Sequence, residues 1–457
     1  MSICESGMQS QVKTGKISVE VSENHPLIML ALSIPWVELY KIISNDLKQG
    51  RWWLGRKLKV RVHLGAFIIQ QLYNLTDRQI EYSIKDNAAY RSFCGYGIVE
   101  NWHAPDHTSI EKFRSRLTPE TQRLLANKVV QLAAQMGFAD PGDVDIDSTV
   151  QEANMTYPTD AKMLRKLGTL AAKVSESLKK LVPGKCSFPQ VDLKEIARTA
   201  RSCFFQKRYA TQEEKSDRLA QLWAAVSQPV IQTIQACRKL CTKDLKRLKW
   251  NIKYSVNQLV SHGEDYLRES KIFVETGKST PTKKLAFHLD EVSCFSKGKM
   301  HKKHEFGRAY QIGRVGGNFL FVASCTSVQM DDKKALKSVI DEHENLFGSK
   351  KIESLGTDKG YYSNKNIKYA VKKGIRKVGI QAPVSVKNNI VQLTPEDQED
   401  LYNRRSGIEP LIGHVKQGGQ LGRSRMKSDE TIKASGYASV LGFNLRQMIK
   451  AKIKSAA

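Results

Sequence analysis

The sequence predicts an α/β fold, in which one mixed-sheet domain carries a long helical insertion and follows an all-helical region. Three observations predict it. Helix start signals recur between about residues 25 and 140, the period then changes to two at DVDIDSTV (143–150), and strands and helices alternate after a long charged helical block. At 457 residues, the chain has room for roughly three domains.

The N-terminal part predicts a flexible tail followed by a helical domain. Residues 1–24 are polar and aperiodic. Between 25 and 140, Thr76-x-x-Gln79 and Thr108-x-x-Glu111 have the spacing of a capping box, and Thr118-Pro119 has an N-cap residue followed by proline at the first helical position. We therefore expect a compact set of short helices over 25–140.

A basic cluster with aromatic neighbours lies in this helical region, around Trp52 and Trp53. It could contact a DNA backbone, and residues 25–140 are therefore a candidate DNA-binding domain. An equally consistent interpretation is a solvated basic helix face beside two core tryptophans. The cluster consists of Arg51, Arg56, Lys57, Lys59 and Arg61.

The catalytic candidates begin on the strand predicted at 143–150. Its alternation places Asp143, Asp145 and Asp147 on one face. Helical text then runs from 159 to 285, which predicts an insertion between a first segment of the sheet domain, 141–158, and a second, 286–457.

The second segment predicts alternating elements. Strand-like text at KLAFHLDEVSCF and RAYQIGRVGGNFLFVASC includes Gly316-Gly317 between two apolar runs, a hairpin signal. A helix over 332–347, a weak strand ending near Asp358, a helix over 363–373 and a strand over 376–380 follow. A last helix is expected to begin at Thr394-Pro395.

Composition favours a polyanionic partner. Lys and Arg number 73 against 46 Asp and Glu, a formal net charge of +27, and nucleic acid is the commonest partner of so basic a chain, although a solvated basic surface gives the same excess. The eight cysteines contain no CxxC pair, which favours a reducing cytoplasm. No apolar run reaches the ~20 residues that span a bilayer, so we expect no membrane association.

The helix predicted from Thr394 carries a concentrated polar face. Tyr402, Arg405, Glu409 and Lys416 lie at offsets of three, seven and fourteen, within roughly 60° of arc on a regular helix. The same residues could form an ordinary solvated face with an Arg405–Glu409 pair. Gly407 and Pro410 weaken the expectation of a regular helix here.

The spacing Tyr402-x2-Arg405-x3-Glu409-x6-Lys416, within LYNRRSGIEPLIGHVKQGGQLGRSR, resembles the Tyr-Arg-Glu-Lys signature of the DDE transposases encoded by bacterial insertion sequences. VDIDSTVQEANMTYPTDAKML resembles the family's first-aspartate strand, SKGKMHKKHEFG the block before its hairpin, and GTDKGYYSNKN its second-aspartate turn. HTSIEKFRSRL and GFNLRQM are similar to the family's N-terminal helical region and to the close of its catalytic domain, so the resemblance spans about 25–450.

The resemblance implies a ribonuclease-H-like catalytic core with Asp147, Asp358 and Glu409 as the triad. Such carboxylates suit two Mg²⁺ or Mn²⁺ ions. Asp145 is an alternative first ligand, although Asp147 precedes the Ser-Thr pair as the family's aspartate does, and Asp358 could be a plain turn aspartate before Gly360.

The other residues of the signature are expected to contact DNA. Arg405 and Lys416 would bind phosphates, and Tyr402 would position either DNA or a metal-bound water. Lys297 and Lys299, with Lys302 and Lys303, form a further basic strip, or else a solvated loop.

The function implied is a transposase that binds terminal inverted repeats of double-stranded DNA, as a homodimer, in the bacterial cytoplasm, and performs metal-dependent cleavage and strand transfer. Two alternatives remain open at this point. One is a catalytically silent, transposase-derived DNA-binding protein, and the other is a metal-dependent nuclease that does not join strands.

Overall fold

A mixed sheet forms the centre of the molecule. The computed structural model describes residues 21–48, 59–96, 103–181, 184, 188–205, 211–296, 304–328, 331–382 and 393–456. The six-stranded sheet comprises β1 (Asp143–Glu152), β2 (Ser293–Ser296), β3 (His304–Val315), β4 (Phe319–Thr326), β5 (Ser354–Thr357) and β6 (Lys377–Ile380).

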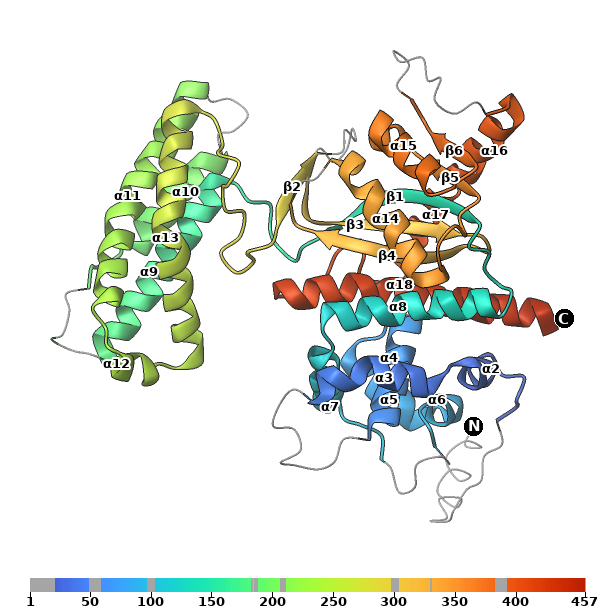
Figure 1. Cartoon of the computed structure of the whole chain (residues 1–457). Helices are drawn as coiled ribbons and strands as arrows, with labels where there is room; N and C mark the ends of the chain where they lie inside the picture. The colour runs from blue at the N-terminus through green and yellow to red at the C-terminus, as the bar shows by residue number, and fades with distance from the viewer. Residues whose placement is uncertain are drawn as a thin grey trace, which may run out of the picture.

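The sheet has an antiparallel half and a parallel half, joined at β1. On one side of β1 lies β3, whose far edge pairs with both β2 and β4, all antiparallel. On the other side β5 runs parallel to β1, and β6 runs parallel to β5 (Figure 1). Because Val144 and Ile146 are buried on one face of β1 and Asp145 and Thr149 on the other, this strand is covered on both of its faces. The strand predicted at 143–150 and the α/β class are thus confirmed.

The hairpin predicted at Gly316-Gly317 joins β3 to β4. Gly317 has a φ of +79°, and a Cβ built on it would lie 2.0 Å from the carbonyl oxygen of Phe138. Only glycine fits there, because the backbone conformation is left-handed and the neighbouring chain leaves no room for a side chain.

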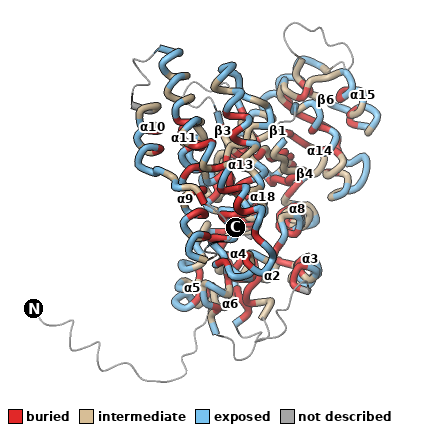
Figure 2. Tube along the Cα trace, turned by 90° about the vertical axis from the view of Figure 1, so that its left-hand side faces the viewer, coloured by how far each residue is buried: buried red, intermediate tan, exposed pale blue. Residues whose placement is uncertain are grey.

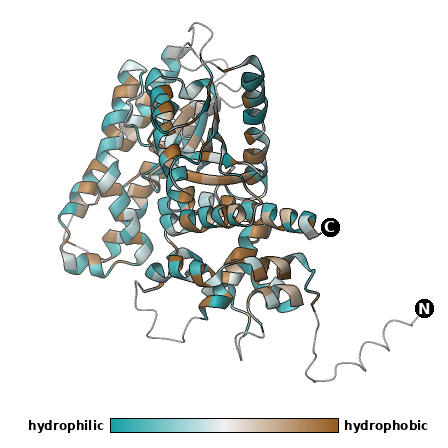
Figure 3. Ribbon diagram, turned by 45° about the vertical axis from the view of Figure 1, so that its right-hand side comes forward, coloured by the Kyte–Doolittle hydropathy of each residue, from teal (hydrophilic) through white to brown (hydrophobic). Residues whose placement is uncertain are grey.

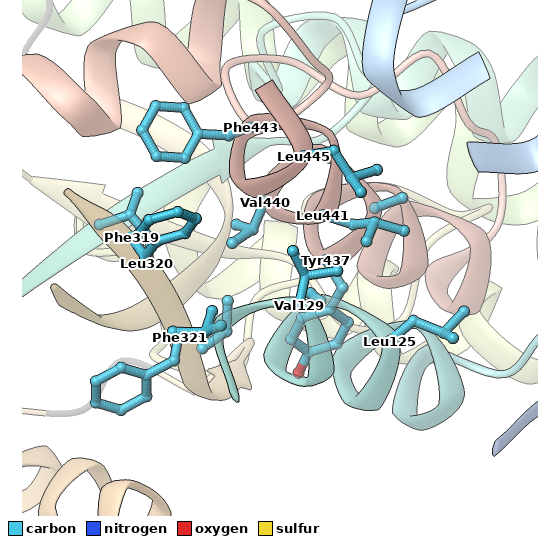
Figure 4. Packing of buried hydrophobic residues seen from close by; sticks show 14 of the residues in the cluster. Leu125, Val129, Phe319, Leu320, Phe321, Tyr437, Val440, Leu441, Phe443 and Leu445 are labelled. Atoms are coloured by element: carbon cyan, nitrogen blue, oxygen red, sulfur yellow. The ribbon is translucent and has the colours of Figure 1, made fainter. Parts of the chain in front are cut away.

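Two long helices lie side by side across one face of the sheet (Figure 1). They are α8 (Pro119–Gln135) and α18 (Asp429–Ala456), and both contact β4. Figure 4 shows Leu125 and Val129 of α8, Phe319 and Phe321 of β4, and Val440 and Leu441 of α18 in this layer. The helix predicted to begin at Thr394 begins there, but it is not the last helix of the chain. The later helix α18 was missed because its apolar residues are buried on several sides and leave no simple stripe.

The remaining elements of the second segment follow the predicted order. The helix over 332–347, the helix over 363–373, the strand over 376–380 and the helix start at Thr394-Pro395 are confirmed. Most of KLAFHLDEVSCF is not strand, since β2 comprises only its last residues and Ser296. The helices of this part are α14 (Asp332–Phe347), α15 (Asn364–Lys372), α16 (Pro395–Ser406) and α17 (Ile408–Gln417), with a 3-10 turn η2 (Lys359–Tyr361).

The N-terminal helices share one apolar cluster with the sheet. Thr76 and Gln79 form the predicted capping box, and Thr118 caps α8 as predicted. The box at Thr108 is wrong, because Asp106 caps that helix. Figure 2 shows the buried residues gathered between the sheet and these helices. The helices are α2 (Pro26–Ser33), α3 (Trp36–Lys48), α4 (Val60–Tyr73), α5 (Asp77–Asp86), α6 (Ala88–Phe93) and α7 (His107–Arg116).

The helical block between β1 and β2 forms a separate bundle beside the sheet (Figure 1). Its apolar side chains pack in a cluster of their own, and Figure 3 shows hydrophobic and hydrophilic residues alternating along its helices. The bundle comprises α9 (Asp160–Leu181), α10 (Leu193–Phe205), α11 (Gln212–Arg238), α12 (Thr242–Lys246) and α13 (Trp250–Thr276).

Within the described part of the chain, no single helix has the length and apolar character needed to cross a membrane. The pair α2 and α3, bent by 72°, meets that requirement only when its two helices are taken together.

Candidate active site

Two of the predicted acids lie where the parallel pairing of β1 with β5 ends, Asp147 within β1 and Asp358 directly after β5. Ile146 of β1 pairs with Thr357 of β5, so Asp147 and Asp358 are each the next residue after a paired position. The Oδ1 atom of Asp147 accepts a hydrogen bond from the backbone N–H of Ser148 at 2.7 Å. Asp358 caps η2 and accepts from the backbone N–H of Gly360 at 3.0 Å. The parallel register therefore places two aspartates at one level of the sheet.

The third acid, Glu409, lies in the first turn of α17. The single helix predicted over 402–416 is interrupted. Helix α16 ends at Ser406, and Gly407 separates it from α17 while keeping a right-handed helical conformation. Pro410 is the third residue of α17, where a backbone N–H would have no acceptor within the helix. A proline, which lacks that N–H, therefore fits the start of a new helix. The expected face thus divides between two helices.

Arg405 connects the acids. Its Nη2 atom lies 3.1 Å from Oε1 of Glu409 and 3.9 Å from Oδ2 of Asp147. Gly356 of β5 allows α16 to pack closely on the sheet. A Cβ built on this glycine would lie 3.3 Å from Cβ of Arg405 and 3.5 Å from the carbonyl oxygen of Leu401. Acids from a strand and a helix start are thus gathered around one guanidinium group.

The carboxylate of Asp358 belongs to the same electrostatic environment as those of Asp147 and Glu409. Burial is the main cause that raises the pKa of Asp358, and the charges of Asp332 and Glu409 raise it further, whereas Arg405 and the bond from Gly360 lower it. The charges of Arg405 and Glu409 therefore both act on the carboxylate of Asp358.

A fourth acid, Asp332, was missed by sequence reasoning. A Cβ built on Gly360 would lie 3.1 Å from Oδ1 of Asp358 and 3.3 Å from Oδ2 of Asp332, so the two carboxylates flank the same glycine. Asp332 accepts a hydrogen bond from Nε2 of Gln311 at 3.2 Å, and Gln311 in turn accepts one from the buried Tyr361 hydroxyl at 2.6 Å. In the sequence, Asp332 gave only the ordinary signal of a helix start.

Asp145 has a different environment from Asp147, although both lie on the same face of β1. Its side chain is 3% exposed and forms ion pairs with Arg404 at 3.1 Å and Arg314 at 3.4 Å. Burial nevertheless raises the pKa of Asp145 more than the two arginines lower it. Arg404 also binds Asp143. Asp143 and Asp145 therefore attach α16 to the sheet.

Two of the predicted DNA contacts, Tyr402 and Arg405, line a cleft of about 740 Å³ together with Thr357, Lys359 and Gln381. Tyr402 is 57% exposed. Lys416 is half-buried at the other end of α17, where its backbone borders Gly422. The structure thus brings Tyr402 to the cleft beside the acids and places Lys416 two turns of helix from Glu409.

Four of the predicted DNA-contacting residues lie outside the described residues. They are Arg56 and Lys57 in the N-terminal basic cluster and Lys297 and Lys299 in the strip before β3.

Arg405 offsets part of the negative charge of the acids in this conformation. Among the residues that the structure describes, no three His, Cys, Asp or Glu side chains are grouped closely enough to hold a metal ion. The guanidinium of Arg405 occupies the space between Asp147 and Glu409 instead, and its Nε atom is buried without a hydrogen-bond partner among the described residues.

Comparison with known proteins gives two family matches in chain order. Residues 16–116 match a transposase domain (DUF772), and residues 293–445 match a transposase DDE domain. The second match includes Asp358 and Glu409, and Asp147 lies between the two. An uncharacterized protein of Rhizobium meliloti, ORF8 in the nfe locus, is 23% identical over 155 residues, which are 33% of this chain and 73% of that protein. None of the solved structures matches the chain. The two transposase matches, which follow one another along the chain, identify it as a member of the DDE transposases encoded by insertion sequences.

Proposed function

We propose that this transposase binds the inverted-repeat ends of its element as double-stranded DNA, cuts them and joins them to target DNA, using two divalent ions held by Asp147, Asp358 and Glu409. The observation that carries the proposal is the position of Arg405, which lies against Asp147 and Glu409 and lowers the pKa of Asp358. This position of Arg405 supports a common site for acids that are far apart in the chain.

The sheet supports a ribonuclease-H-like assignment. An antiparallel hairpin, β3 and β4, lies on one side of β1, and the parallel strands β5 and β6 lie on the other. We propose this fold for residues 141–158 and 286–457, with 159–285 as an insertion.

The donor atoms fit Mg²⁺ or Mn²⁺, because all three groups are carboxylates and hard cations prefer oxygen. The chemistry that two such ions supply at a phosphodiester is activation of the attacking oxygen and stabilisation of the leaving one. Three carboxylates brought together raise one another's pKa, so a nearby positive charge is required to keep them ionised. Arg405 provides that charge in the conformation described here.

Arg405 and its neighbours would hold the DNA. The unpaired Nε of Arg405 would be satisfied by a phosphate oxygen if the side chain turned toward bound DNA. Tyr402 and Lys359 line the same cleft and offer a phenol and an ammonium group to the strand. Asp145 and Asp143, through Arg404, would fix the helix that carries Arg405.

We further propose that the helical region 25–140 binds the element ends, that the protein acts as a homodimer on DNA, and that it acts in the bacterial cytoplasm, where that DNA lies. The formal net charge of +27 supports a polyanionic partner.

The test uses purified full-length protein, an end-labelled duplex containing the element terminus, and Mg²⁺ or Mn²⁺. Asp147→Ala, Asp358→Ala and Glu409→Ala are each expected to abolish nicking and Mn²⁺ binding. Glu213→Ala removes an exposed acid from the first turn of α11 and serves as the matched control.

A second substrate with a pre-cut donor end separates the possible outcomes. Joined products that depend on all three acids support the proposal, and nicking without joining supports a nuclease. Persistent nicking in the three variants contradicts the site. A protein that binds the duplex but never cuts it is a silent DNA-binding protein.

A further inference from the structure

An exposed aromatic pair lies on the helical insertion, outside the candidate active site. Trp250 is 79% exposed and Tyr254 is 42% exposed, although both belong to a long helix, α13. Their rings stack, with centroids 5.6 Å apart and an angle of 13° between the planes. The hydroxyl of Tyr254 accepts a hydrogen bond from Gln258 Nε2 at 2.9 Å, which helps to hold its ring in place.

The packing of the bundle does not require these two rings. The opposite face of α13 carries Ile252, Val256 and Leu259, which are buried in the apolar cluster of the bundle. Trp250, in contrast, leaves most of a large apolar surface in water. The two rings therefore form an exposed apolar surface that the core of the bundle does not use.

Positive charge dominates the chain on either side of the aromatic pair, while burial and then the charges of Asp290 and Asp429, from outside the bundle, raise the pKa of Tyr254. Between residues 238 and 262 the sequence has seven Lys or Arg residues and a single acid, Asp244, which is buried. Five of these cations lie within eleven residues of Tyr254 in the sequence, and all five are exposed. These five exposed side chains are Lys243, Lys246, Arg247, Lys249 and Lys253.

We propose that Trp250 and Tyr254, with the five cations beside them, form a platform that binds an unpaired stretch of DNA strand. An aromatic ring gains energy by stacking on a base face, and only unpaired bases offer their faces, because those of a duplex are already stacked on one another. The cations match the phosphates of the same strand. The inference rests on the proposed DNA chemistry of this transposase.

The platform is separate from the acids. Figure 1 places α12, which immediately precedes α13, at one end of the bundle and well away from α16 and α17. A strand bound there would lie away from the bond being cut, so the platform would hold a displaced or flanking strand and take no part in the chemistry.

Fluorescence anisotropy of the full-length protein, without divalent metal, tests the platform. One probe is a fluorescein-labelled mixed-sequence oligonucleotide without self-complementarity, and the other is the duplex of the same sequence. Trp250→Ala is expected to weaken binding of the single strand about five- to hundredfold and to change duplex binding less than about twofold. Trp250→Phe, which keeps a ring, should retain most of the single-strand affinity.

Ile272→Ala is the control, because it removes another exposed apolar side chain from α13. An equal loss for single strand and duplex, or a Trp250→Ala affinity equal to that of the control, overturns the proposal. The proposal is also overturned if Trp250→Ala leaves the single-strand affinity unchanged but abolishes self-association in sedimentation. The rings would then contact a second copy of the protein. Cleavage by the triad variants is measured separately, so failure of the platform and failure of the active site give different results.

Discussion

Replacing Arg405 with alanine gives the sharpest test of the proposed metal site, because the guanidinium and a divalent ion would compete for the same carboxylates. Nη2 of Arg405 lies 3.1 Å from Glu409 and 3.9 Å from Asp147. A divalent ion held by those oxygens would therefore lie roughly 4 to 5 Å from the guanidinium if the arginine stayed in place.

The magnitude follows from Coulomb's law. A charge of two and a charge of one repel by about 2 kcal/mol at that separation in a water-like dielectric, which is appropriate because Glu409 is 61% exposed. Removing the arginine should tighten Mn²⁺ binding by about 10- to 30-fold in the absence of DNA. Cleavage should nevertheless fall, because the phosphate loses its bidentate partner.

Isothermal titration calorimetry with MnCl₂ at pH 8 measures the binding, and a labelled terminus measures cleavage. Arg405→Lys keeps the charge and should bind Mn²⁺ about as the unaltered protein does. Arg376→Ala removes an exposed arginine elsewhere in the same part of the chain and should change neither quantity. If Arg405→Ala binds Mn²⁺ no more tightly, the three acids around this guanidinium are not the ligands.

Three further predictions concern stability and pH. Asp145→Asn should leave Mn²⁺ binding intact and cost about 1 to 3 kcal/mol in urea denaturation, because two arginines lose a shared acceptor; lost Mn²⁺ binding would instead make Asp145 the ligand. The pKa of Asp358 is raised by burial, so its charge opposes folding above its usual pKa, and this penalty disappears as pH falls through the raised value. Asp358→Asn should therefore raise the urea midpoint at neutral pH, and an unchanged midpoint would contradict this. In the unaltered protein, Mn²⁺ affinity should begin to decline at a higher pH than it would with an ordinary aspartate as ligand. Gly317→Ala should cost more than about 2 kcal/mol, since its Cβ would meet a carbonyl oxygen at 2.0 Å, whereas Gly137→Ala, with a φ of +75° and open space, should cost about 1 kcal/mol. Equal urea midpoints for the two glycine variants would contradict the steric argument.

Features set by short stretches of chain could be predicted from the sequence. The strand at 143–150, the Gly316-Gly317 hairpin and the helix starts at Thr118 and Thr394 all follow from local preferences of a few residues. The choice between competing caps could not be predicted, as at Asp106 and Thr108, because it depends on a small difference in local geometry.

The candidate site needed the tertiary structure, because its parts come from distant segments. The sequence proposed Asp147, Asp358 and Glu409 by resemblance and left Asp145 as an alternative to Asp147. The parallel register of β1 and β5 decided that Asp147 and Asp358 lie at one level, and the break at Gly407 decided that Glu409 begins a new helix.

Some residues of the site could be found only in three dimensions. Asp332 is an ordinary helix-start residue in the sequence, and it flanks Gly360 opposite Asp358 only after α14 packs on the sheet. The sequence by itself determined where strands, turns and caps form, because these depend on neighbours along the chain. The tertiary structure alone decided which charges meet, because electrostatic energy depends on distance in space and buried partners are chosen by packing.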